Sequence, residues 1–229
     1  MNGTNVTHSE LPEERTERSL RTVAGGGSLV EAIGGIAAIV LAIFGLAGGM
    51  ANDMMAIATI VLGASLILEG GAIAASYRRA LFALEGETAG SAELGGAATV
   101  EFLAGFTGIV MGILALLGVG TLNYFISVSA IVFGASLALS SSAVARLSAF
   151  WSSNWYLNES SRSIAQTSCE TRAGGQMLVG LAAIVLGILA LLGINSVVLN
   201  LVALLTLGVS VLLSGTAFGA RTMMHTKRA

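Results

Sequence analysis

The sequence predicts an all-α polytopic membrane protein, with six transmembrane helices arranged as three repeated helical hairpins in a pseudo-threefold bundle. Three observations lead to this fold: the composition, the long uncharged runs and a segment that occurs three times. Apolar residues make up 55% of the 229-residue chain and charged residues only 10%, against about 45–50% and about 25% in soluble domains. Such a composition is typical of a protein whose main solvent is lipid.

The repeated segment defines the structural unit. Its three copies cover 34–48, 104–118 and 179–193, and each ends in glycine after a run such as GIVMGILALLG. Each copy continues into a second apolar stretch that contains a glycine two residues before a serine, at 63–65, 134–136 and 208–210. Since repeats of this kind fix the architecture, the unit is predicted to be a helical hairpin that is used three times.

Uncharged runs then give the individual spans. No Asp, Glu, Lys or Arg occurs within 102–145 or 173–220, and each run is long enough for two crossings at about 20 residues each. Glu31, Asp53 and Glu69 interrupt the first repeat. Backbone groups in lipid must be satisfied within the segment, so the runs are predicted to be helices. The six predicted spans cover 29–48, 54–76, 99–118, 123–145, 177–193 and 197–220.

Basic residues predict the orientation. They lie before the first span, after the second, between the fourth and fifth, and after the sixth, while the turns within hairpins carry none. The positive-inside rule therefore places both termini and both long loops in the cytoplasm. We expect a flexible cytoplasmic tail at 1–27, a transmembrane domain at 28–221 with repeats 28–79, 98–148 and 173–221, and a cytoplasmic tail at 222–229.

Small residues spaced four apart predict where the helices pack. Helices in lipid associate where small side chains allow a close backbone approach. The first helix of each hairpin carries such a pair on one face: Ala38/Ala42, Gly108/Gly112 and Ala183/Gly187.

A polar layer is predicted near the cytoplasmic edge of the hydrocarbon core. Repeat alignment makes Glu31, Glu101 and Gln176 equivalent, and it makes Glu69 equivalent to Ser140 and Ser214. Glu31 and Glu69 each lie about 25 Å from the outer turn at 1.5 Å per residue, so both sets fall at one depth.

Two interpretations of this layer stay open. Buried ionisable groups mark ion or proton paths, and two carboxylates such as Glu31 and Glu69 raise one another's affinity for a proton. Alternatively, the acids are interfacial: Glu31 follows Ser28 at capping-box spacing, and the helix dipole favours a carboxylate in the first turn. The interfacial interpretation is favoured for Glu31 and Glu101, whereas Glu69 comes late in its helix, where the dipole disfavours it.

An aromatic cluster follows the fourth span. Phe150, Trp151, Trp155 and Tyr156 include both tryptophans of the chain. Such rings anchor a helix end at headgroup depth, and the alternative is a contact surface for a partner. Membrane lipids are thus the expected partners, with a homo-oligomer or a larger membrane complex left open. A net charge of −2 without a basic stripe predicts no nucleic-acid partner.

Catalytic residue sets are missing from the predicted spans. The two histidines, His8 and His225, lie in the terminal tails, and Cys169 is the single cysteine. A His-based acid–base pair, triad or zinc site cannot be built from these residues within the membrane. Serines such as Ser140 are expected to bond their own helix backbone or a neighbouring helix. We therefore expect no enzyme activity, no cofactor and no metal.

The run GIVMGILALLG, a tight turn and a second helix of the type IVLGASLILEGGAIA resemble the HdeD-like family over residues 28–221. The resemblance implies a six-span protein of the bacterial inner membrane linked to acid resistance, with no catalytic residues. The chain departs from the family in lacking proline at the outer turns, since its one proline is Pro12. Three hypotheses result: a non-enzymatic stress-response or structural membrane protein, a small ion or proton channel or transporter, and an accessory subunit of a larger membrane complex.

Overall fold

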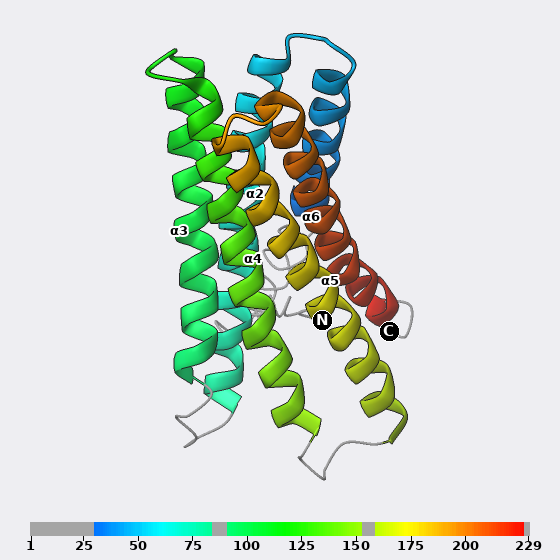
Figure 1. The fold of residues 1–229 in the computed structure, drawn as a ribbon. Coiled ribbons are helices and arrows are strands. Elements are labelled where there is room, and N and C mark those ends of the chain that lie inside the picture. The colour runs from blue at the N-terminus through cyan, green and yellow to red at the C-terminus, as the bar shows by residue number, and fades with distance from the viewer. Residues whose placement is uncertain (1–29, 84–90, 153–158, 227–229) are drawn as a thin grey trace, which may run out of the picture.

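A computed structural model describes residues 30–83, 91–152 and 159–226, and within these ranges the chain forms six helices and no strand (Figure 1). The first helix runs from Val30 to Leu46. The others are α2 (Ala51–Ala83), α3 (Ser91–Leu116), α4 (Leu122–Ser152), α5 (Glu159–Leu191) and α6 (Ser196–Thr226). Helices α2 to α6 each contain a segment long and apolar enough to cross a membrane, whereas the first helix is shorter. The predicted class, an all-α membrane protein, is confirmed.

Three tight turns join successive helices at one end of the bundle (Figure 1). Gly48, Gly118 and Gly193 follow the helix ends with φ of +90°, +68° and +82°. In each turn the glycine N–H donates to the carbonyl three residues earlier, and the next N–H donates to the carbonyl five residues earlier. This is the Schellman pattern, in which glycine supplies the left-handed residue. Two residues further on, φ is positive again at Met50, Gly120 and Asn195.

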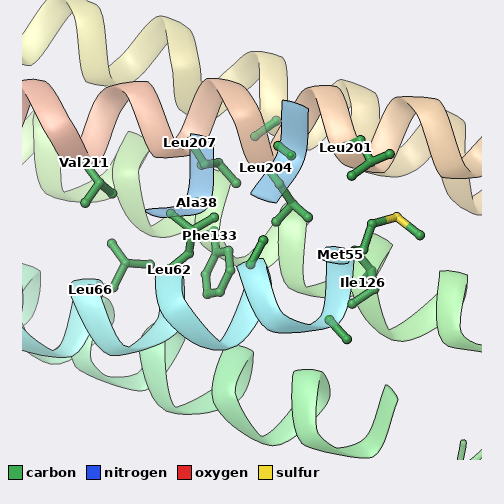
Figure 2. Close-up of a cluster of buried hydrophobic side chains, with 14 of the residues drawn as sticks. Ala38, Met55, Leu62, Leu66, Ile126, Phe133, Leu201, Leu204, Leu207 and Val211 are labelled. Atoms are coloured by element: carbon green, nitrogen blue, oxygen red, sulfur yellow. The ribbon is translucent and has the colours of Figure 1, made fainter. Parts of the chain in front are cut away.

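Helices α2, α4 and α6 form the centre of the bundle, where each contacts the other two. Their apolar side chains make one cluster along the axis; Figure 2 shows Leu62 and Leu66 of α2 facing Leu207 and Val211 of α6, with Phe133 of α4 beside them. The membrane-length segment of α2 is 56% buried, against 33% in α3 and 28% in α5. Helices α3 and α5 are therefore outer helices.

The closest backbone approaches occur at three places that we call the glycine seams. A Cβ added at Gly63 would lie 2.5 Å from the carbonyl oxygen of Gly105. One added at Gly180 would lie 2.5 Å from the carbonyl of Gly134, and one at Gly35 would lie 2.8 Å from that of Gly208. Since no side chain fits at these distances, glycine is what lets the helices touch. The seams join α2 to α3, α4 to α5, and the first helix to α6.

The small-residue face predicted from the sequence is buried. Ala38, Ala42 and Ala183 are fully buried, and the glycines at 108, 112 and 187 are buried as well. Gly108 lies against the ring of Phe133 on α4. The prediction of a helix contact along this face is confirmed, and the tightest contacts lie one turn before it, at the glycine seams.

Several helices are longer than the spans predicted from hydropathy. Helix α5 begins at Glu159 rather than near residue 177, and α3 begins at Ser91 rather than near residue 99. Apolar periodicity marks only the part of a helix that lies in an apolar environment, so a polar extension is not detected by it. Helix α2 continues to Ala83, beyond the end of the second predicted span at residue 76.

Candidate functional site

Glu69 of α2 is the centre of a buried polar group. Its side chain is 1% exposed. The Ser214 hydroxyl of α6 donates to Glu69 Oε1 at 2.6 Å, and Gln176 Nε2 of α5 donates to the same oxygen at 3.3 Å. The hydrogen bond from Gln176 joins the two sets of positions that the repeat alignment placed at one depth. We call Glu31, Glu69, Glu101, Gln176 and Ser214 the glutamate layer.

The other two acids of the layer are equally buried. Glu31 on the first helix and Glu101 on α3 are each 1% exposed. Glu31 lies in the first turn of its helix as described, where the helix dipole favours a carboxylate. Glu101 does not, because α3 begins ten residues earlier at Ser91; the first-turn interpretation is therefore wrong for Glu101. Among the described residues, no three acidic, histidine or cysteine side chains lie close enough to hold a metal ion.

Serines near the layer bond to their own helices. The hydroxyl of Ser140 donates to the Leu137 carbonyl at 3.3 Å, and that of Ser141 donates to the Ala138 carbonyl at 2.9 Å. Intrahelical bonding of this kind satisfies a hydroxyl in an apolar environment. The prediction that these serines bond their own backbone is confirmed.

A second polar group, which we call the asparagine cluster, lies nearer the tight turns and was missed from the sequence. It consists of Asn123 and Ser127 of α4 and Asn200 of α6. The Ser127 hydroxyl donates to Asn200 Oδ1 at 3.0 Å and also lies 2.7 Å from the Asn123 carbonyl. Asn200 Nδ2 donates to that carbonyl at 3.4 Å. The sequence feature that could have indicated this cluster is Asn200, an amide side chain within an otherwise apolar run.

Apolar side chains fill the axis between the two polar groups. Leu62, Phe133 and Leu207 stand at equivalent repeat positions on the three central helices, and all are at most 1% exposed. Leu66, Leu137 and Val211 form the next equivalent set, at most 2% exposed. Seven residues separate Leu62 from Glu69, a rise of about 10 Å along the helix. The two polar groups are thus separated by a packed apolar section (Figure 2).

The aromatic cluster is only partly within the described chain. Phe150 and Trp151 belong to the last turn of α4, whereas Trp155 and Tyr156 lie outside the described residues. The predicted tail at 1–27 also lies outside them. Interpretations of these segments stay predictions.

The helices and their buried polar groups define a polytopic α-helical membrane protein. Comparison of the chain with protein-family models, with curated proteins and with solved structures gives no match.

Proposed function

We propose that this chain is a non-enzymatic, six-span integral membrane protein of the HdeD-like type, built from three hairpins with pseudo-threefold symmetry, and that it acts in a structural or stress-response role. The observation that supports this proposal best is the packed axis: the equivalent sets around Phe133 and Leu137 are apolar and at most 2% exposed. A bundle packed in this way works through its presence and contacts in the bilayer. The repeated Schellman turns and glycine seams support three equivalent hairpins.

Orientation follows from the distribution of basic residues. Reporters fused after Gly49 or Gly120 should report a non-cytoplasmic location, and a matched fusion after Gly86, in the predicted cytoplasmic loop, should report the opposite. A cytoplasmic signal from either turn fusion would contradict the proposed topology.

The stress-response role is tested by removing the chain from its host. Survival after a shift to acidic medium should fall and should return when the wild-type chain is supplied. Survival that is equal with and without the chain, under acid and at neutral pH, would leave only the structural role.

Proton or ion transfer at the glutamate layer is a second candidate function. The observation in its favour is that three carboxyl groups, those of Glu31, Glu69 and Glu101, are each 1% exposed. Ionisable side chains buried within membrane helices mark ion or proton paths, and the three carboxyls are of this kind.

Flux through purified protein in liposomes tests this second candidate. With a pH-sensitive dye inside, the wild-type chain should dissipate an imposed proton gradient faster than protein-free vesicles do, and Glu69→Gln should slow it. Ser140→Ala is the matched control, because Ser140 occupies the equivalent position on α4 and bonds its own helix. Equal fluxes for wild type and Glu69→Gln would exclude transport through this layer.

A further inference from the structure

The three glycine seams differ in how far apart their partners are in the chain. Helices α2 and α3 are consecutive, as are α4 and α5, so two of the seams join neighbours. The third seam joins the first helix to α6, the last helix described, through Gly35 and Gly208. This closing seam completes the ring of helices, and it is the one that chain connectivity does not bring together.

The contacts at the glycine seams do not by themselves determine which two helices meet at each seam. In all three, a glycine on one helix meets the backbone of a glycine on the other. Apolar contact between helices in lipid lacks the driving force that it has in water, and small-residue contacts are alike wherever they occur. Because the three seams are alike, their contacts do not fix the depth of α6 in the bundle or the helices beside which it packs.

Interhelical hydrogen bonds do fix the depth and the neighbours of α6. The four described above all end on α5 or α6: two on Glu69, and two between α4 and Asn200. The residues Glu69 and Asn200 are not repeated by the threefold pattern. Glu69 is replaced by serine at both equivalent positions, and Asn200 is replaced by Met55 and Ile126. The glutamate layer and the asparagine cluster thus hold α6 at two depths, one near each end of the packed apolar section.

We propose that Glu69 and Asn200 are positioning residues that fix the depth and order in which α6 docks on α2 and α4, and that they thereby close the seam with the first helix. Asn200 is fully buried, so a shift of α6 by one turn would separate its amide from the Ser127 hydroxyl. A buried amide that loses its partners is costly, and a single buried asparagine is known to fix register between packed helices. Glu69 provides the same constraint at the other end.

The rate of disulfide formation across the closing seam measures how readily α6 packs against the first helix. A Cβ at Gly208 would lie 3.2 Å from the Cβ of Ala38, close to the separation of about 3.5–4.5 Å in a disulfide. Gly208→Cys with Ala38→Cys, in a Cys169→Ser background, therefore reports closure in the full chain. The control pair is Gly34→Cys with Ser65→Cys, whose Cβ atoms lie 3.3 Å apart and which joins the first helix to its neighbour α2.

Each pair is then combined with Glu69→Met, Asn200→Leu or the control Ser140→Ala. Glu69→Met and Asn200→Leu should slow trapping at the closing seam by about fivefold for each hydrogen bond removed, and should leave the control pair unchanged. Ser140→Ala should change neither. Glu69→Gln retains a side-chain oxygen that can accept from Ser214, so it should trap like wild type.

Two results would overturn the proposal. One is unchanged trapping at the closing seam in both Glu69→Met and Asn200→Leu. The other is an equal decrease in the closing and control pairs, since that would mean the two residues stabilise the bundle in general. If Glu69→Met lowers the yield of folded protein, a preformed disulfide at the closing seam should restore it, and failure to restore it also counts against the proposal.

Discussion

Adding one methyl group at a glycine seam should force the two helices apart, and Gly63→Ala tests this between α2 and α3. The new Cβ would lie 2.5 Å from the Gly105 carbonyl oxygen and 3.0 Å from the Ile109 backbone nitrogen. Both are backbone atoms, so no side chain can rotate away. To reach ordinary van der Waals contact, α2 and α3 must separate by about 1 Å, which forfeits a quarter to a half of each contact across the seam.

The magnitude follows from two opposing contributions. Overpacking costs about 1–3 kcal/mol, whereas alanine in place of glycine favours the helix by about 0.8–1.0 kcal/mol. Gly71 lies in the same helix with nothing within 4 Å of an added Cβ, so Gly71→Ala carries the helix contribution without the clash. The free energies of unfolding of the two variants should therefore differ by about 1–3 kcal/mol.

Unfolding in mixed micelles, with increasing amounts of a denaturing detergent and helix content as the readout, measures this difference. Gly71→Ala should be as stable as wild type or slightly more stable, and Gly63→Ala should be less stable. If the two variants unfold at the same detergent fraction, the backbones are not in contact at this seam, and the packing described here is wrong.

Three further predictions concern single side chains and can use the same unfolding assay. Met50 has φ of +42° and is 67% exposed, so Met50→Gly should stabilise the protein by about 1 kcal/mol through relief of the left-handed conformation; a loss of stability would contradict this. Phe133→Ala removes the largest fully buried side chain and should cost about 3–5 kcal/mol, whereas Phe106→Ala, at an outer position 58% exposed, should cost far less. Gly108→Ala would place a methyl group against the Phe133 ring; Phe133→Leu should offset part of its cost, and strictly additive effects in the double variant would argue against that contact.

The sequence predicts those features of the fold that depend on local chemistry. The glycines at 48, 118 and 193 end their helices as the repeat predicted, because a left-handed residue is needed where a helix turns sharply. The helices themselves follow from the requirement that backbone groups be bonded internally in lipid. The burial of Ala38 and Ala42 also follows from their spacing on one face.

The long-range pairing of the helices is not predicted by the sequence. Small residues mark a contact face without naming its partner, so the seam between Gly35 and Gly208 was not predicted. Ser127 and Asn200 are separated by 73 positions, and no local pattern links a hydroxyl to an amide at that distance. For Glu101, the first-turn interpretation was wrong because hydropathy does not detect the polar turns by which α3 begins earlier.

The closing seam also has a consequence for biosynthesis. About 170 residues separate its two glycines, so at about 5–20 residues per second the ribosome needs roughly 10–35 s to deliver the second partner after the first. During that interval the small-residue face of the first helix, with Ala38 and Ala42, has no α6 to pack against. Other newly inserted helices and the insertion machinery of the membrane meet that face before α6 is made.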